Sequence, residues 1–286
     1  MKNISYLKPL VFLVLMGLAL GFLASNGSAP QSSEVKEKRL DEASGLASSF
    51  THPGILYANN DSGKPAEIFA LNSKGEIKAI LEFEDIKNRD WEEVATSAGT
   101  GKGSGYLYIG EIGDNNARWK TVFIYRVPEP DKLKPTIKIN AVDKFEIEYE
   151  DGPRDAEAFF VDPLTQDFII ISKREEKVGV YRVAYPQSTT SVNVATKIGT
   201  LPLTWVTGAD ISPDGRQILI KTYTNVYQLK RAKKTSIAKA IRGKLRPLPY
   251  IIEPQGEAVC FGVKGKGRYT LSERNGDIPL YLYYYK

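Results

Sequence analysis

A short acidic motif that recurs along the chain constrains its fold more than any other feature. The clearest copies read Arg-Asp-x-Glu-x-apolar, one copy has Gln in place of the Asp, and two looser copies carry Ser44 and Thr207 at the Glu position. The five copies are residues 42–46, 89–94, 154–159, 206–209 and 255–259. Recurrence of this kind indicates that one supersecondary unit was copied along the chain.

The spacing of the copies indicates which unit was copied. The aligned positions are 44, 92, 157, 207 and 257, at intervals of 48, 65, 50 and 50 residues. An interval near 50 is long for helical repeats and is typical of a four-stranded propeller blade, for which about 40 to 50 residues are usual. The longer second interval predicts an insertion or a split blade.

Short β-rich runs follow every copy of the motif. They are rich in β-branched and aromatic residues and are bounded by Pro and Gly turns, as in Phe168–Ile171 and Gln217–Ile220. We therefore predict an all-β fold, a single β-propeller of four-stranded blades, with five blades favoured and six as the alternative. The last unit runs out of chain after three strands, so we expect an N-terminal strand around residues 34–40 to close the ring.

The first residues are typical of an export segment. Lys2 and Lys8 precede an uncharged apolar run, residues 9–23, that is shorter than the roughly 20 residues of a membrane span. We predict a signal peptide over residues 1–29 and a propeller domain over residues 30–286, in a periplasmic or extracellular protein. Pro30 follows the small residues that would be cleaved, so an uncleaved N-terminal membrane anchor is the alternative.

Composition excludes several classes of function. The net charge of +5 falls to +3 without Lys2 and Lys8, which gives no reason to expect nucleic-acid binding. One histidine, His52, and one cysteine, Cys260, exclude an internal disulfide and a zinc site built from several His or Cys ligands. The sequence contains no Gly-x-Ser-x-Gly nucleophile elbow, so it gives no support for a Ser-His-Asp triad that uses His52. We expect a monomer.

Propeller geometry would bring the repeated carboxylates together. The first strand of each blade lines the central channel, so Glu92, Glu157 and Glu257 would converge there, with Ser44 and Thr207 completing the circle. Residues two positions earlier would approach the channel mouth, namely Glu42, Asp90, Asp155 and Gln255. Several carboxylates in one cavity repel each other and lose solvation, so a cation, backbone amides, basic partners or water must compensate them.

Calcium is one candidate for that compensation, because it takes six to eight oxygen ligands. The candidate metal ligands are Glu92, Glu157, Glu257, Asp90, Asp155 and Asp114. The alternative, favoured by the neighbouring Arg89 and Arg154, is that the carboxylates pair with groups of the protein and lock adjacent blades together. Residues expected at the rim are of mixed charge: Asp61, Glu111, Lys173, Glu273 and Arg274. They would suit an anionic ligand bridged to a cation, or equally a neutralised surface without a ligand.

Five motifs in order carry a resemblance to a known family. They are Asp90-Trp91-Glu92-Glu93, Gly110–Asn115, Asp155–Ala158, Thr207–Gly215 and Gln255–Ala258. The chain resembles, over nearly all of residues 30–286, a largely uncharacterised family of secreted bacterial propeller proteins. It is more distantly similar to phytase-related esterase-like and gluconolactonase-like propellers, in which acidic channel residues hold calcium.

The distant resemblance implies calcium and hydrolysis by analogy only. Ser44 and Thr207 stand where an acid would be expected, which lowers the charge of the site. We therefore expect a binding or interaction module with a divalent cation and a small or anionic ligand. The alternative is a calcium-dependent hydrolase of phosphoesters or lactones, with Glu157 and Glu92 as candidate catalytic residues.

Overall fold

The computed structural model describes residues 29–98 and 105–286, and almost all of its regular structure is β-strand. The all-β prediction is thus confirmed. The predicted export segment lies outside the described residues, apart from its last position. Within the two described ranges, no helix combines the length and the apolar character that crossing a bilayer requires.

The strands form five antiparallel units of four. Unit 1 contains β2 (Ala43–Ser48), β3 (Ile55–Asn60), β4 (Glu67–Asn72) and β5 (Ile77–Phe83). Unit 2 contains β6 (Glu93–Ala98), β7 (Gly105–Glu111), β8 (Val122–Pro128) and β10 (Asp143–Tyr149). Unit 3 contains β11 (Ala156–Val161), β12 (Phe168–Ser172), β13 (Gly179–Val183) and β14 (Asn193–Thr200). Unit 4 contains β15 (Val206–Ile211), β16 (Gln217–Thr222), β17 (Val226–Lys230) and β18 (Arg246–Leu248). Unit 5 contains β19 (Gly256–Phe261), β20 (Arg268–Ser272), β21 (Leu280–Tyr285) and β1 (Gln31–Val35).

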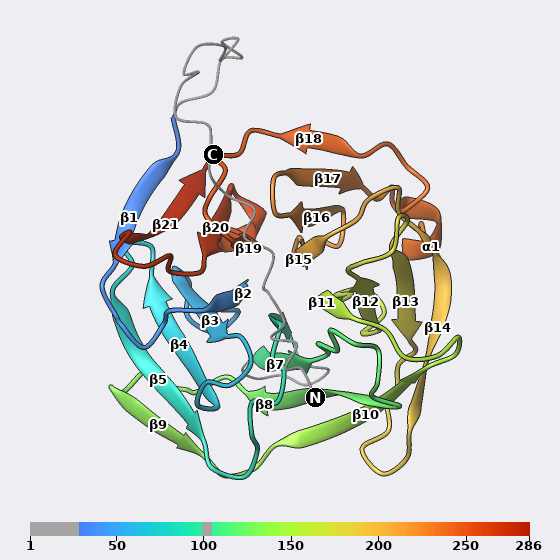
Figure 1. Ribbon diagram of the computed structural model, residues 1–286, viewed down its shortest axis with the longest axis horizontal. Helices are drawn as coiled ribbons and strands as arrows, with labels where there is room; N and C mark the ends of the chain where they lie inside the picture. Colours follow the sequence, from blue (N-terminus) through green and yellow to red (C-terminus); the bar gives the residue numbers. More distant parts are fainter. Residues whose placement is uncertain (1–28, 99–104) are drawn as a thin grey trace, which may run out of the picture.

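The units are arranged around a common centre (Figure 1). Their first strands β2, β6, β11, β15 and β19 contact one another in sequence order, and β19 contacts β2. The two ends of the described chain meet in unit 5, where β1 pairs with β21 from Gln31 opposite Tyr284 to Val35 opposite Leu280. The N-terminal strand thus begins a few residues earlier than the predicted 34–40.

The long second interval of the repeat builds extra strand pairing at the outer edge. Residues between β8 and β10 form β9 (Thr136–Ile139), which pairs in parallel with β5 of the preceding unit. The outer strands β10 and β14 also pair in parallel, so units 2 and 3 share one eight-stranded sheet. The additional strand β9 therefore covers the edge of β5, and β10 and β14 cover each other's edges, which would otherwise expose unpaired backbone groups.

Side chains alternate between the two faces of each unit, and neighbouring units cover both faces. In β12, Ile170 packs in the cluster shared with unit 2, whereas Ile169 and Ile171 pack in the cluster shared with unit 4. All five residues of β12 are buried, which explains its continuous apolar sequence. Full burial of one such large apolar side chain contributes about 1.5–3 kcal/mol, so the contacts between units stabilise the whole arrangement.

Two short helical segments lie outside the sheets. Helix α1 (Ile237–Ala240) begins after Ser236, whose hydroxyl accepts from the Lys239 N–H, and the 3₁₀ turn η1 (Val263–Gly265) follows β19. Ile237 joins the apolar cluster between units 3 and 4. Helix α1 is therefore a single turn that is held against the sheets by its apolar side.

One side chain links three of the first strands at the centre. Glu93 is fully buried, and its Oε1 accepts from the N–H groups of Leu46, at 3.1 Å, and Val94, at 3.2 Å. Its Oε2 accepts from the N–H of Ala209 at 3.0 Å. Because Leu46 lies in β2 and Ala209 in β15, a single carboxyl joins units 1, 2 and 4.

The other units leave room for this carboxyl. At the position of Glu93 in the repeat they carry only Gly or Ala, namely Gly45, Ala158, Gly208 and Ala258. A Cβ atom added at Gly208 would lie 3.3 Å from Glu93 Oε2 and 2.7 Å from the Glu257 carbonyl oxygen. The repeat is thus asymmetric at its centre, with one large residue and four small ones.

We expect Glu93→Ala to lower the free energy of unfolding by about 3 kcal/mol or more, because buried N–H groups lose their acceptor. Glu93→Gln, which retains one acceptor oxygen, should lose about half as much. Urea unfolding followed by circular dichroism measures both. The control is Glu84→Ala, whose side chain is 47% exposed and pairs with Lys138, and a loss for Glu93→Ala no larger than for this control would contradict the assigned role.

Candidate functional site

β-Bulges orient the residues of the predicted circle. The strand register shifts once near the start of β2, β11, β15 and β19, between residues 43 and 45, 156 and 158, 206 and 208, and 256 and 258. The residues skipped by the pairing are Ser44, Glu157, Thr207 and Glu257. A bulge leaves its extra residue outside the ladder and re-aims the side chain. In unit 2, Glu92 lies just before β6, and its N–H donates to the Gly110 carbonyl at 2.9 Å.

All five residues of this circle are buried, and some are directly linked. The Ser44 hydroxyl donates to the Glu92 carbonyl oxygen at 2.7 Å and lies 3.3 Å from Glu92 Oε2. The Thr207 hydroxyl donates to the carbonyl oxygen of Glu257 at 3.1 Å. The two hydroxyl residues therefore connect unit 1 to unit 2 and unit 4 to unit 5.

Three carboxylates form a compact group at this end of the ring. Asp61, Asp90 and Glu92 each offer an oxygen, and these atoms all lie within 4.8 Å of one another. Asp61 follows β3 of unit 1, and Asp90 and Glu92 precede β6 of unit 2. We call these three residues the acidic triad. It combines two of the predicted metal ligands with one residue predicted for the rim.

Gly113 leaves the space that the acidic triad occupies. A Cβ atom added there would lie 2.2 Å from Glu92 Oε1 and 2.5 Å from Asp90 Oδ2. The Gly113 N–H also donates to the Asp90 carbonyl oxygen at 3.3 Å. Gly113 of the Gly110–Asn115 motif is thus required for steric reasons, which could not be seen from the sequence alone.

Three of the other four predicted metal ligands have partners within the protein. Glu157 forms a buried ion pair with Lys173, and Asp155 pairs with Arg174. Asp155 also accepts from the Asp114 N–H at 2.9 Å, and Asp114 accepts from the Trp119 N–H at 2.7 Å. For Glu157, Asp155 and Asp114 the structure therefore shows pairing within the protein.

The two arginines expected beside the carboxylates bind other acids. Arg89 approaches Glu111 at 3.5 Å, and Arg154 approaches Glu175 at 3.1 Å and also pairs with Asp151. Their immediate neighbours Asp90 and Asp155 thus do not use them as ion-pair partners.

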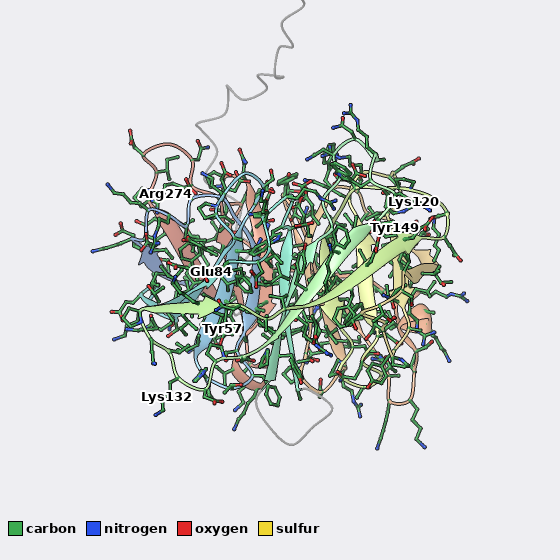
Figure 2. All side chains as sticks on the ribbon, turned by 90° about the horizontal axis from the view of Figure 1, so that it is seen from below. Tyr57, Glu84, Lys120, Lys132, Tyr149 and Arg274 are labelled. Atoms are coloured by element: carbon green, nitrogen blue, oxygen red, sulfur yellow. The ribbon has the colours of Figure 1, made fainter. Side chains whose placement is uncertain are left out.

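The predicted rim residues divide into two groups. Lys173 and Glu273 interact electrostatically with Glu257 and Asp61, and Glu273 also accepts from the Gln255 side-chain amide. Arg274 instead donates to the backbone carbonyls of Val35, at 3.2 Å, and Glu37, at 3.3 Å, and it lies at the edge of the molecule in Figure 2. Arg274 therefore binds the segment that contains β1. Glu111, another predicted rim residue, is close to Arg89 and interacts with it.

Burial and mutual repulsion raise the pKa of the carboxyls at this end. Burial first, and then the charges of Asp61 and Asp155, raise the pKa of Asp90 to about 6. Burial raises the pKa of Glu257 to about 7, and burial and Glu257 raise the pKa of Glu273 to about 8. Burial, Asp61 and Asp90 raise the pKa of Glu92 well above its usual value. The basic residues that the structure describes at this end therefore do not fully offset the burial and repulsion of these four carboxyls.

Two buried polar residues near the centre were not among the predicted site residues. Glu93 is the first, and Lys221 is the second, with its ammonium donating to the carbonyls of Gly256, at 2.6 Å, and Thr222, at 3.1 Å. Burial lowers the pKa of Lys221 to about 8. The signal that would have identified Glu93 is the set of small residues aligned with it in the other four units.

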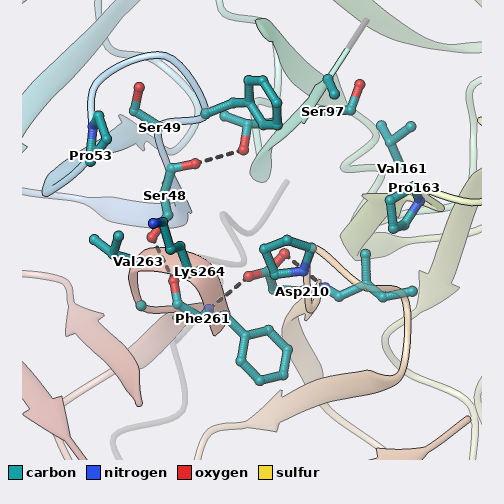
Figure 3. Close-up of a pocket in the computed structure, with 16 residues that line it drawn as sticks. Ser48, Ser49, Pro53, Ser97, Val161, Pro163, Asp210, Phe261, Val263 and Lys264 are labelled. Atoms are coloured by element: carbon teal, nitrogen blue, oxygen red, sulfur yellow. Dashed lines mark hydrogen bonds between the residues drawn. The ribbon is translucent and has the colours of Figure 1, made fainter. Parts of the chain in front are cut away.

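A cavity opens at the opposite end of the first strands, with a volume of about 350 Å³ (Figure 3). It is lined by the final residues of the first strands and the turns that follow them, including Ser48, Ser97, Val161, Ile211 and Phe261. The acidic triad lies where these strands begin. The two features therefore occupy opposite ends of the ring, with Glu93 between them.

Comparisons with known proteins add little. No known family model matches the sequence, and no curated protein matches it. Among solved structures, the chain is similar to a chain of the Kuenenia stuttgartiensis hydrazine synthase, with a TM-score of 0.41 and 14% sequence identity over 82% of this chain and 93% of that chain.

The raised pKa values predict that stability falls with rising pH when no divalent cation is present. A carboxyl whose pKa is higher in the folded than in the unfolded state favours folding while it is protonated, and this contribution is lost as pH rises through the folded value. For Asp90, Glu257 and Glu273 the loss spans the range from their usual values to about 6, 7 and 8. We expect a decrease of about 2 kcal/mol or more between pH 5 and pH 8 in a chelator.

Urea unfolding at several pH values measures this dependence. Glu273→Gln should flatten the profile, because one of the titrating groups is removed. Glu148→Gln serves as the control, because its side chain is 41% exposed and lies 3.6 Å from Lys120 at the surface. A protein that becomes more stable from pH 5 to pH 8 in chelator would refute the assignment of a repulsive acidic end.

Proposed function

We propose that the chain is a five-bladed β-propeller, closed by its N-terminal strand, that binds a divalent cation at the acidic end of its centre. The blades correspond to the five units. Three observations support this reading: the repeat near 50 residues, the closed cycle of contacts among the first strands, and the pairing of β1 with β21. We further propose that it acts as an exported binding or interaction module.

The acidic triad is the observation that carries the proposed cation site. Its oxygens are hard ligands contributed by two units and lie within 4.8 Å of one another. Carboxylates at this spacing repel, and burial together with that repulsion raises the pKa values of Asp90 and Glu92. A bound cation would replace repulsion by attraction. Calcium suits a site of irregular geometry better than magnesium, which requires near-ideal octahedral coordination.

The surroundings of the triad favour a ligand beside the cation. Three carboxylates provide fewer oxygens than the six to eight that calcium takes. The remaining positions would accept water or an oxygen of an anionic ligand. Lys173 lies close enough to the triad to influence Asp61 and Glu92, and its positive charge would favour an anion.

We expect calcium to raise the melting temperature relative to chelator. A cation at a hundred times its dissociation constant contributes about 2.7 kcal/mol. Asp90→Asn should abolish the shift and should not destabilise the protein in chelator, because it removes one of the repelling charges. Differential scanning calorimetry measures both effects.

The matched control for this experiment is Asp143→Asn. Asp143 lies on the outer strand β10 and pairs with Arg126 of β8. This variant should keep the full calcium shift. A wild-type protein that melts at the same temperature in calcium and in chelator would show that the triad holds no calcium.

One observation favours catalysis as a second candidate function. Glu157 Oε2 is buried and has no hydrogen-bond partner among the described residues, whereas its Oε1 pairs with Lys173. A carboxylate oxygen with free lone pairs near a cation is suited to act as a general base on water. The cation would polarise the ester or lactone carbonyl, or the phosphoryl group.

If the protein is a hydrolase, Glu157→Gln should lower kcat about 100-fold or more, as loss of a general base does. It should keep the calcium shift in melting temperature, because Glu157 lies outside the triad. Steady-state assays on a generic phosphomonoester and a simple lactone provide the measurement. Wild-type rates equal to the uncatalysed background would leave the binding module as the function.

A further inference from the structure

The cavity at the end of the ring opposite the acidic triad has the properties of a separate ligand site. Its volume of about 350 Å³ lies within the range of small-molecule pockets. Most of its wall is apolar and comes from the ends of the first strands and from the turns that follow them, with Pro53, Pro163 and Pro213 among the lining residues. Proline side chains lose little conformational freedom on binding, so these walls are preformed.

One acidic side chain lines this apolar cavity. Asp210, in β15, accepts from the N–H of Phe261 in β19 and from the N–H of Ile211, each at 2.7 Å (Figure 3). These two bonds use one lone pair on each carboxylate oxygen and fix the orientation of the group. Each oxygen retains capacity for a further donor.

The negative charge of Asp210 has no cationic partner among the described residues. Burial raises the pKa of its carboxyl to about 7, and only the two backbone N–H groups act against this effect. A charge in an apolar environment is unfavourable unless it is paired. An Asn at position 210 could accept one of these N–H groups without the cost of burying a charge. A cation bound beside Asp210 in the cavity would favour the ionised form of its carboxyl.

We propose that this cavity binds a small organic cation, with its ammonium group on Asp210 and its apolar body against the proline-rich wall. The other hydroxyl groups nearby are largely engaged: Ser48 donates to the Phe261 carbonyl at 2.5 Å, and Thr96 donates to the Ser48 carbonyl at 2.6 Å. Asp210 is thus the main polar contact for a ligand.

Lys264 adds a second element of specificity. It is exposed and lines the same cavity, in the turn η1 after β19. Its ammonium would repel a ligand with two positive charges more strongly than a ligand with one. The cavity should therefore prefer monoamines to diamines of similar length.

The test uses the full chain and phenethylamine, an arylalkylamine whose size suits the cavity. Isothermal titration calorimetry compares it with 2-phenylethanol, the neutral analogue, with 3-phenylpropanoate, the anionic analogue, and with 1,5-diaminopentane. We expect phenethylamine to bind about tenfold more tightly than the alcohol, and the anion and the diamine to bind more weakly still. Equal affinity for amine and alcohol, or no amine binding at about 10 mM, would overturn the proposal.

Variants locate the site. Asp210→Asn should remove the preference for amine over alcohol, whereas Asp61→Asn in the acidic triad should retain it. If Asp210→Asn does not fold, Lys264→Glu provides a second test, because the Lys264 side chain lies at the surface. It should raise the affinity for phenethylamine about threefold at low salt and that for the alcohol not at all. An unchanged amine affinity in Lys264→Glu, or a retained amine preference in Asp210→Asn, would exclude this cavity as the site.

Discussion

The bonds of one buried carboxyl hold the centre of the ring. Glu93 accepts N–H groups from β2, from its own strand β6 and from β15, so it joins strands that are far apart in the sequence. Backbone groups of first strands have no ladder partner on the side that faces the centre, and buried N–H groups without acceptors are unfavourable. Five identical units would leave this deficit at every strand. One unit with a long acidic side chain, surrounded by Gly and Ala in the others, satisfies several of these groups at once.

The same carboxyl divides the centre into two chemically different ends. Glu92 directly precedes it and belongs to the acidic end, whereas Ser97, four residues after it, lines the cavity. At about 3.3 Å per residue, Glu92 and Ser97 lie roughly 16 Å apart along β6. At the acidic end, Glu157 and Glu257 stand at bulges outside the strand ladder, and Asp61, Asp90 and Glu92 come from the segments that flank β3 and β6. The other end is formed by turns rich in proline, and a single carboxyl lines its cavity. The difference follows from the sequence at the two ends of the same strands.

The sequence predicted the repeated features well and the exceptions poorly. The β-rich runs predicted the all-β content, and the period of the motif predicted equivalent environments for Glu92, Glu157 and Glu257, which are all buried, because a copied unit places equivalent residues alike. It did not predict the partners of Arg89 and Arg154, which bind Glu111 and Glu175. Neighbours in a sequence point in different directions near a strand, so adjacency to Asp90 or Asp155 was a poor guide. The cavity was not predictable, since its wall combines turns from several units.

The carboxylates at the acidic end differ in whether a basic side chain pairs with them. Lys173 neutralises Glu157 and Arg174 neutralises Asp155, so unit 3 compensates its carboxylates with its own cations. Units 1 and 2 contribute the triad without an equivalent ion pair among the described residues. If the carboxylates served only to join neighbouring units, the arrangement in unit 3 would be expected in unit 2 as well. A Cβ atom at residue 113 would lie 2.2 Å from Glu92 Oε1 and 2.5 Å from Asp90 Oδ2, so these two carboxylates can take their positions only because residue 113 is Gly. Carboxylates that lie this close without an ion pair repel one another and destabilise the fold, so the joining of neighbouring units does not explain their placement.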